Sequence, residues 1–199
     1  MTKAELRGIM KARLAGLDPE AFTGGGAEAA ERLCAAELWD RCGQVLLFFT
    51  LPSEIDTAPL LDRAFAAGKE VFFPKTRGPE MDFFRVDCPG GAWPKGAWGI
   101  PEPPDTSPER LFRPAASPAL IVTPGLAFDR RGNRLGRGRG YYDRFFARLD
   151  RAGARYHAAG FCLPPQVVEE VPAEAFDRRL DALCTSGELL RFQERRRQA

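Results

Sequence analysis

A short run without polar residues most constrains the fold of this chain. Residues 45–49 read Val-Leu-Leu-Phe-Phe. A strand with one face in solvent alternates polar and apolar residues, whereas a strand covered on both faces is apolar throughout. The run therefore predicts a buried strand in a parallel sheet. Two more strands are predicted at residues 71–74 and 119–123, and Pro124-Gly125 ends the second of them.

Helical patterns separate the predicted strands. Residues 2–5 form a capping-box sequence, and an apolar stripe at helical spacing follows it. Asp18-Pro19 ends or redirects this first helix. We expect the glycines at 24–26 to form a flexible break before a second helix over residues 27–41. The stripe of the first helix consists of Leu6, Ile9, Met10, Leu14 and Leu17.

The remaining pattern continues the alternation of strands and helices. Pro59 lies in the first turn of a third helix, which Gly68 closes. A more exposed strand is predicted at residues 81–86, and the proline-rich stretch 88–118 predicts an irregular surface excursion. A helix over 141–152 and strands at 157–162 and 180–185 complete the series. Such alternation predicts a single α/β domain over 1–199, with a three-layer, open, mostly parallel sheet covered by helices on both faces.

Composition excludes several other classes of protein. The chain has 199 residues, 44% of them hydrophobic, and a formal net charge of +2. These values are typical of a globular domain, not of a basic or acidic tail. We recognise neither a signal peptide nor an apolar run of the roughly 20 residues that span a bilayer. The five cysteines contain no C-x-x-C pair, so we expect a cytoplasmic protein with reduced thiols and with Cys162 and Cys184 in the core.

The loop at residues 129–140 is the strongest candidate for chemistry. It reads Asp-Arg-Arg-Gly-Asn-Arg-Leu-Gly-Arg-Gly-Arg-Gly and lies between a predicted buried strand and a helix. Ligands of open α/β sheets bind beyond the carboxyl ends of strands. Glycine lets the backbone approach a ligand, its amides bind anions, and arginine pairs with phosphate oxygens through two donors. The loop therefore predicts a polyphosphate site, strengthened by the amino end of the following helix.

The spacing of this loop leaves alternatives open. It contains neither G-x-x-x-x-G-K-[ST] nor G-x-G-x-x-G, so pattern alone indicates only an anion site. A solvated or RNA-contacting arginine loop has the same composition. A module that binds nucleic acid through this loop and Arg195–197 is a second hypothesis, with Tyr141 and Tyr142 as stacking residues.

Several single residues allow both a functional and a structural interpretation. Asp143 in the first turn of a helix suits either a helix cap or magnesium, and Asp181 is a second candidate carboxylate for the metal. Lys3 and Arg7 share one helix face, which is either a solvated basic face or part of a site. Glu54 follows the first strand and is either a turn residue or the acceptor for a donor-rich heterocycle. The single histidine, His157, lies in a strand-like run without a nucleophile partner and is interpreted as structural.

At this loop the sequence resembles a known family. Residues 124–143 closely resemble the signature of 5-formyltetrahydrofolate cyclo-ligase, also called methenyltetrahydrofolate synthetase. Further agreement, in the same order along the chain, occurs around Lys3 to Arg7, at 53–57, at Phe73-Pro74, at 81–83, at 99–103 and at Leu180-Asp181. The resemblance covers nearly the whole chain. It also implies a fold similar to that of phosphosugar isomerases and CoA transferases, and an enzyme of that kind is a further alternative.

The resemblance implies a reaction and a set of roles. ATP and 5-formyltetrahydrofolate become 5,10-methenyltetrahydrofolate, ADP and phosphate, with Mg²⁺, in a monomeric protein that binds neither nucleic acid nor membrane. Catalytic roles fall to Arg137, Arg139 and Tyr141. ATP contacts are expected from Lys3, Arg7, Arg134, Leu135, Gly136, Arg137, Gly138, Arg139, Gly140, Tyr141 and Tyr142. Folate contacts are expected from Phe49, Glu54, Trp98, Arg137, Gly138, Arg139, Gly140 and Tyr141, and magnesium ligands from Asp143 and Asp181.

Overall fold

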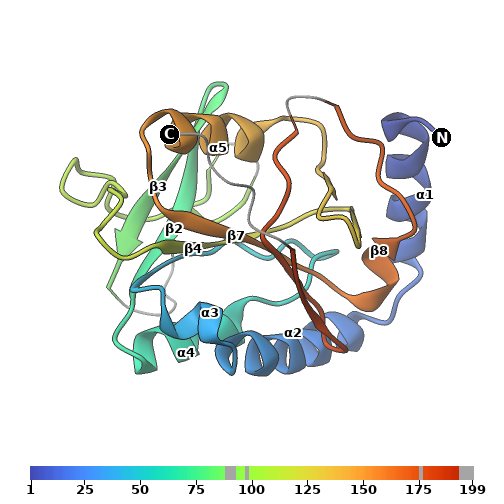
Figure 1. Cartoon of the computed structure of the whole chain (residues 1–199), viewed down its shortest axis with the longest axis horizontal. Helices are drawn as coiled ribbons and strands as arrows, with labels where there is room; N and C mark the ends of the chain where they lie inside the picture. The colour runs from blue at the N-terminus through green and yellow to red at the C-terminus, as the bar shows by residue number, and fades with distance from the viewer. Residues whose placement is uncertain (88–92, 97–98, 175–176, 193–199) are drawn as a thin grey trace.

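The structure, a computed structural model, describes residues 1–87, 93–96, 99–174 and 177–192. This part of the chain forms a seven-stranded sheet in the order β10-β9-β7-β4-β1-β2-β3 (Figure 1). The strands from β9 to β2 are parallel, and the two edge strands β10 and β3 are antiparallel to their neighbours. The bounds are β1 Gln44–Leu46, β2 Glu70–Arg77, β3 Glu80–Val86, β4 Ala119–Thr123, β7 Tyr156–Phe161, β9 Ala182–Cys184 and β10 Leu189–Arg191.

Helices cover both faces of this sheet. In Figure 1 α5 lies above the strands, and α2, α3 and α4 lie below them. Alternate residues of a strand point to opposite faces, and Val45 and Leu47 accordingly enter one apolar core while Leu46 enters the other. The predicted three-layer α/β fold is confirmed. The helices are α1 Lys3–Ala15, α2 Pro19–Cys34, α3 Glu37–Asp40, α4 Ala58–Ala66 and α5 Tyr141–Arg151, with a 3-10 turn η1 at Pro164–Gln166.

A second, three-stranded sheet in the order β6-β5-β8 was not predicted. Its strands are β5 Ala127–Asp129, β6 Arg134–Leu135 and β8 Val167–Val168. Phe128 pairs with Arg134 of β6 and with Val167 of β8. Strands of two or three residues are too short to show an alternating pattern, which explains why the sequence did not reveal them.

The glycines at 24–26 are the clearest correction to the predicted helices. Helix α2 begins at Pro19 and runs through all three glycines, with the Asp18 side chain accepting from the Glu20 N–H at 2.9 Å as an N-cap. A Cβ at Gly26 would lie only 2.4 Å from the Asp56 carbonyl oxygen. The glycine therefore allows α2 to approach the segment after β1, and tertiary packing overrides the low helix propensity of glycine.

The edge strand β3 is more buried than we expected. Met81, Phe83 and Phe84 are each less than 5% exposed, and the rings of Phe83 and Phe145 of α5 lie 4.8 Å apart. Helix α5 thus covers this edge, which accounts for apolar residues on a strand that has one free side. The other edge strand, β10, follows the last predicted strand after a short turn and was missed.

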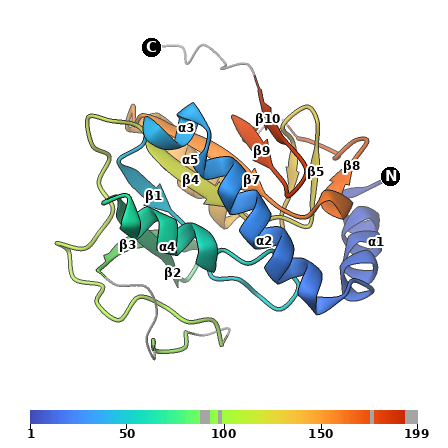
Figure 2. The same ribbon diagram turned by 90° about the horizontal axis from the view of Figure 1, so that it is seen from below.

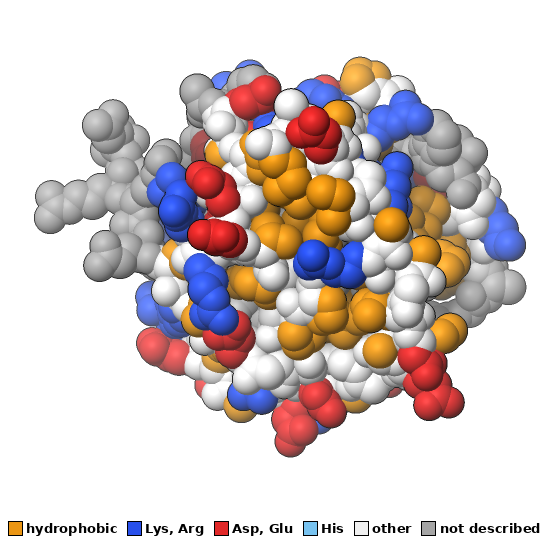
Figure 3. All heavy atoms as spheres, turned by 90° about the vertical axis from the view of Figure 1, so that its right-hand side faces the viewer, with side chains coloured by type: hydrophobic (Ala, Val, Ile, Leu, Met, Phe, Trp, Pro, Cys, Tyr) orange, Lys and Arg blue, Asp and Glu red, His pale blue; other side chains and the backbone are white. Residues whose placement is uncertain are grey.

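Helix α1 forms as predicted except for one residue of its stripe. Thr2 and Glu5 make both hydrogen bonds of the capping box, and Leu6, Met10 and Leu14 are buried. Ile9 is 49% exposed. Figure 3 shows the face of the molecule that carries α1, and apolar side chains gather there between charged ones. No helix in the described ranges is both long and apolar enough to cross a membrane.

The cysteines of the described residues are free thiols. Cys42, Cys162 and Cys184 are buried, as expected for the last two. Burial raises the pKa of Cys42 to about 11 and that of Cys184 to about 12. These thiols therefore stay protonated and fill the core. His157 lies in β7, 9% exposed, opposite Leu120 of β4, which agrees with a structural role.

Candidate nucleotide and folate site

The arginine- and glycine-rich segment at 129–140 begins with the last residue of β5, which follows the central strand β4 after a short connection. The buried Asp129 shapes its first half: Oδ1 accepts from the N–H groups of Arg131 and Asn133, both at 2.9 Å, and Oδ2 accepts from the Val171 N–H at 3.0 Å. The carboxylate is completely buried. Asp129 therefore holds the β5–β6 hairpin and ties it to the chain after β8.

The second half of the segment forms the entry to α5. Gly138 has φ +98° and Gly140 has φ +67°, a region that glycine occupies at little cost. Gly140 is the N-cap of α5, and no side chain caps the helix there. The first-turn N–H groups of α5 thus lack a side-chain acceptor, as in helix ends that bind anions.

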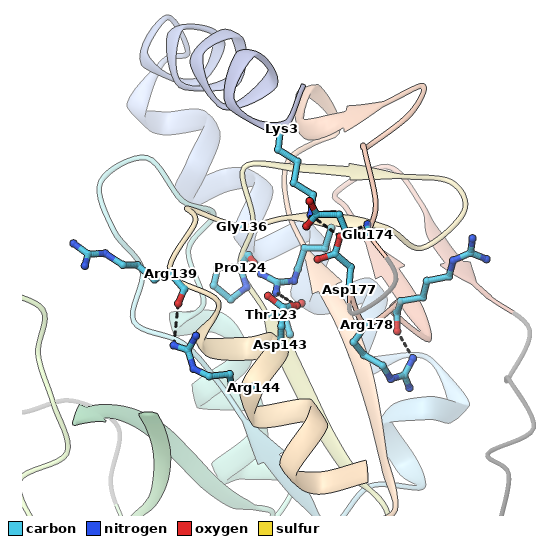
Figure 4. A network of polar contacts seen from close by, with 12 residues as sticks. Lys3, Thr123, Pro124, Gly136, Arg139, Asp143, Arg144, Glu174, Asp177 and Arg178 are labelled. Carbon is cyan, nitrogen blue, oxygen red and sulfur yellow. Dashed lines mark hydrogen bonds and ion pairs between the residues drawn. The ribbon is translucent and has the colours of Figure 1, made fainter. Parts of the chain in front are cut away.

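Helix α1 meets this loop although 129 residues separate the contacts. Arg7 Nε donates to the Gly136 carbonyl oxygen at 3.0 Å, and a Cβ at Gly138 would lie 3.5 Å from Arg7 Cζ. Arg7 therefore contacts the loop and is not simply part of a solvated face. Figure 4 shows Lys3, also on α1, pointing to Glu174 and Asp177, with Nζ 2.7 Å from an oxygen of each.

Hydrogen bonds to two carboxylates affect the pKa of Lys3. Burial lowers its pKa, but the bonds to Asp177 and Glu174 outweigh this effect and raise the pKa above its usual value. Lys3 is therefore a cation over the whole physiological pH range. It carries that charge beside the loop in the ligand-free protein.

Glu54 and Arg137 join the segment after β1 to the loop. Arg137 Nη2 lies 3.0 Å from Glu54 Oε1, Arg137 Nε donates to the same oxygen at 3.1 Å, and Nη2 donates to Ser53 Oγ at 3.2 Å. The Glu54 side chain is 8% exposed. Burial raises its pKa, and the Arg137 charge and the Leu51 N–H only partly oppose this effect.

Arg134, Tyr142 and Asp143 form a partly buried group at the start of α5. Arg134 Nη2 donates to Asp143 Oδ1 at 3.2 Å, and Nη1 donates to the Pro124 carbonyl at 3.3 Å. The Arg134 guanidinium lies 5.2 Å from the centre of the Tyr142 ring. Among the described residues, Arg134 Nε and the Tyr142 hydroxyl are buried polar atoms without a hydrogen-bond partner. The Asp143 side chain is 29% exposed.

Aromatic rings from the segment after β1, from β2 and from the chain after β3 form a wall. Phe49 lies 4.4 Å from Phe73 and 4.9 Å from Trp93, measured between ring centres. Sequence reasoning missed Trp93 as a member of this wall. The proline-rich stretch 88–118 contains two tryptophans, and the predicted folate contact was the other one. That other residue, Trp98, lies outside the described residues.

Tyr141 and Arg139 lie at the far side of the loop. The Tyr141 hydroxyl donates to the Gly78 carbonyl at 3.2 Å, which ties the start of α5 to the turn between β2 and β3. The Arg139 carbonyl accepts from Arg144 Nη2 at 2.9 Å, an interaction drawn in Figure 4. Gly136 and Leu135 supply backbone at the opposite end, where Leu135 is buried.

Asp181 and Asp143 have different protein partners. Its Oδ2 accepts from the Ala158 N–H at 2.8 Å, and its Oδ1 accepts from Arg178 Nη2 at 3.2 Å. Arg178 also lies 3.8 Å from Asp150, which is two helical turns after Asp143, about 10 Å along α5. Asp181 thus lies beside the carboxyl-terminal half of α5 and has protein donors on both oxygens.

Comparison with known proteins identifies the family. The model of the "5-formyltetrahydrofolate cyclo-ligase family" matches residues 1–186. The chain belongs to this family. A Schizosaccharomyces pombe relative, "Probable 5-formyltetrahydrofolate cyclo-ligase", is 31% identical over 96% of this chain and 98% of its own length. The mouse 5-formyltetrahydrofolate cyclo-ligase is 26% identical over 90% of this chain and 91% of its own.

Solved structures agree with the cyclo-ligase family. The NMR structure of Aquifex aeolicus 5,10-methenyltetrahydrofolate synthetase has a TM-score of 0.80 and 30% identity, and covers 98% of this chain and 95% of its own. A Mycoplasma pneumoniae 5,10-methenyltetrahydrofolate synthetase, at 19% identity and a TM-score of 0.71, shares the fold; it covers 94% of this chain and 99% of its own. Family membership makes the chain a ligase of folate one-carbon metabolism, which decides against an isomerase or CoA-transferase activity.

Proposed function

We propose that this cyclo-ligase family member converts 5-formyltetrahydrofolate to 5,10-methenyltetrahydrofolate while ATP becomes ADP and phosphate. One observation carries the proposal. Arg7 of α1 and Glu54 after β1 both reach the loop at 136–140, through the Gly136 carbonyl and through Arg137. A basic surface for a polyphosphate thereby adjoins a buried carboxylate for a heterocycle with N–H donors.

The reaction requires positioning more than a protein nucleophile. The formamide carbon of the substrate is a poor electrophile, and its oxygen is a poor leaving group. Transfer of the γ-phosphoryl group of ATP to that oxygen releases ADP and gives an imidoyl-phosphate-like species. N10 of the substrate then attacks the same carbon, and the carbon–oxygen bond breaks to release phosphate. Phosphoryl transfer of this kind depends on alignment and on neutralised charge.

The loop and α1 supply cations and N–H donors for ATP. In our proposal Lys3, Arg7 and Arg137 contact phosphate oxygens, and the backbone from Arg134 to Tyr142 surrounds the phosphates. The amino end of α5 has no side-chain cap, which leaves its dipole and N–H groups to an anion. The buried Arg134 Nε and Tyr142 hydroxyl, which lack protein partners among the described residues, suit a ligand or an ordered water, because buried polar atoms are usually paired.

Glu54 and the aromatic wall suit the folate. A carboxylate accepts from the N–H groups of a pterin ring, and Phe49 contributes an apolar surface against which the ring packs. Arg139 and Tyr141 lie at the end of the loop that faces the turn after β2, where we place the reacting formyl group. The folate contact expected of Trp98, which lies outside the described residues, stays a prediction.

Magnesium fits the donor set at Asp143. The described residues gather no group of three or more metal-binding side chains, and Mg²⁺ typically uses one or two carboxylates with waters and substrate phosphates. Asp143 is partly exposed at the amino end of α5, where phosphates are expected. When bound, the ion would neutralise phosphate charge. Asp181 as a second ligand stays a prediction.

The activity is tested by mixing the protein with ATP, Mg²⁺ and 5-formyltetrahydrofolate and following the absorbance of the methenyl product. We expect a rise that requires ATP. Arg137→Ala should fold normally, because the Arg137 side chain is 38% exposed, and should bind ATP at least about tenfold more weakly. A wild-type protein that gives no ATP-dependent absorbance rise would remove the proposal.

A further inference from the structure

We propose that Arg144 of α5 is a positioning residue, one that orients the backbone of the phosphate loop without touching substrate. The proposal rests on the proposed function for its consequence in catalysis, but its geometric part is independent of the reaction. Arg144 lies outside the set of residues for which the sequence predicted a role. It is half-buried in the first turn of α5, and its side chain lies against Gly140, the last residue of the loop.

The Arg144 guanidinium joins two segments that are distant in sequence. Nε donates to the Pro79 carbonyl at 2.9 Å, and Nη2 donates to the same oxygen and to the Arg139 carbonyl at 2.9 Å. A Cβ at Gly140 would lie 2.9 Å from Arg144 Nη1. The side chain therefore fills the space between the loop and the turn connecting β2 and β3.

Tyr141 completes this arrangement. Its ring lies under the Arg144 guanidinium, 5.4 Å from ring centre to Cζ. Its hydroxyl donates to the Gly78 carbonyl at 3.2 Å. Two side chains from the first turn of α5 thus bind consecutive carbonyl groups of the same turn, which gives the loop a fixed support.

The contact with the Arg139 carbonyl determines the direction of one N–H group. A peptide unit is planar and trans, so its carbonyl and its N–H point in opposite directions. When Arg144 holds the Arg139 carbonyl, the Gly140 N–H must point away from Arg144. Gly140 is the N-cap of α5 and one of the expected phosphate contacts. Arg144 therefore orients a donor before the phosphate arrives, which reduces the ordering cost of binding.

Arg148 provides a matched control on the same helix. One turn after Arg144, it donates through Nη2 to the Met81 carbonyl at 2.8 Å and to Asp82 at 2.7 Å. It also attaches α5 to the β2–β3 hairpin, but among the described residues its hydrogen bonds and ion pairs reach only that hairpin. A general loss of helix docking would therefore appear equally in Arg144→Gln and Arg148→Gln.

The first test uses trypsin on the ligand-free protein, since the loop contains cleavage sites after Arg137 and Arg139. We expect Arg144→Gln to be cleaved about tenfold faster at these sites than the wild type, because a local opening governs such cleavage. Arg148→Gln should stay within about twofold of the wild type. Arg144→Lys keeps the charge but not the bidentate guanidinium donor, so its cleavage rate should be intermediate.

The second test measures kinetics of the same variants. The KM for ATP should rise about tenfold in Arg144→Gln, the order of one charged hydrogen bond, while the KM for 5-formyltetrahydrofolate stays within about twofold. Equal trypsin rates in Arg144→Gln and the wild type, or equal effects of Arg144→Gln and Arg148→Gln, overturn the positioning role. If the wild type lacks the proposed activity but the trypsin difference holds, the proposed function fails and the loop support stands.

Discussion

Glu54 is a buried carboxylate, with the residue only 7% exposed. Among the described residues, Arg137 is its only charged hydrogen-bond partner. Burial of a charged group costs free energy, and an ion pair recovers that cost only with good geometry. Here burial has the larger effect on the pKa of Glu54, which is raised. The neutral acid is therefore more favoured in the folded state than in the unfolded state. Above the raised pKa, the ionised carboxylate lowers the stability of the fold.

Glu54→Gln should accordingly stabilise the ligand-free protein at neutral pH and weaken folate binding. The gain in thermal stability should shrink as the pH falls through the raised pKa towards the unfolded value of 4.5, because both proteins are then neutral at this position. Thermal unfolding at several pH values measures the first effect, and folate titration the second. A variant that is less stable than the wild type at pH 7 would show that the Arg137 pair outweighs the burial cost.

Asp143 and Asp181 differ in what they contact, so their replacement separates two roles. Asp143→Asn should raise the magnesium concentration required for activity and leave the melting temperature nearly unchanged, since its carboxylate is partly exposed. Asp181→Asn replaces one of the two oxygens that accept from the Ala158 N–H and from Arg178 with an NH₂ donor and removes the negative charge, and should lower stability by about 1–3 kcal/mol. Magnesium titrations of activity and urea unfolding of both variants test this. A shifted magnesium titration in Asp181→Asn alone would assign the metal to Asp181.

At the scale of elements, α2 shows how packing decides where a helix runs. Its three consecutive glycines lower intrinsic helix stability, yet the helix continues through them across one face of the sheet (Figure 2). The reason differs from one glycine to the next. Gly26 faces the Asp56 carbonyl and Gly25 faces Leu163, whereas a Cβ at Gly24 meets no described atom within 4 Å.

This difference predicts opposite effects of one substitution. Gly24→Ala should stabilise the protein by about 0.5–1 kcal/mol, because alanine is the better helix former. Gly26→Ala should destabilise it by about 1–3 kcal/mol, since the added methyl group overlaps a backbone oxygen. Urea unfolding of the two variants provides the comparison, and each serves as the control for the other. Equal changes would mean that α2 does not pack on the segment after β1 as described.

At the scale of the whole molecule, the site assembles from three distant parts of the chain. Helix α1, the segment after β1 and the loop before α5 meet at one edge of the sheet. Lys3 attaches α1 to Glu174 and Asp177, and Arg7 attaches it to Gly136. Cytoplasmic location, a monomeric state and the absence of nucleic-acid partners stay predictions.

Arg7→Met should weaken ATP binding about tenfold and speed hydrogen exchange of α1 in the ligand-free protein, because it removes the contact with the loop. Arg13→Met is the control on the same helix, since Arg13 donates to the Pro165 carbonyl at 3.0 Å, away from the loop. Its ATP affinity should stay within about twofold of the wild type. Calorimetric titration with a non-hydrolysable ATP analogue gives the affinities. Similar losses in both variants would reduce Arg7 to a residue that only docks α1.

Local patterns along the chain were sufficient to predict the order of the larger elements and to locate the loop. Apolar runs such as residues 119–123, the capping box at Thr2 and the Pro59–Gly68 pair act through neighbouring residues, so a linear pattern records them. The alternation of arginine and glycine likewise indicated an anion site, and the family resemblance supplied the roles.

Which distant residues meet depends on the folded chain. Nothing in the local pattern places Arg7 on Gly136, pairs Arg137 with Glu54, or gives Asp143 and Asp181 different arginine partners. The helix through the glycines at 24–26 and the two- and three-residue strands of the small sheet also depend on contacts made across the fold. The physical reason is the same in each case. Burial and pairing between segments contribute more than local propensity, and a linear pattern contains no record of them.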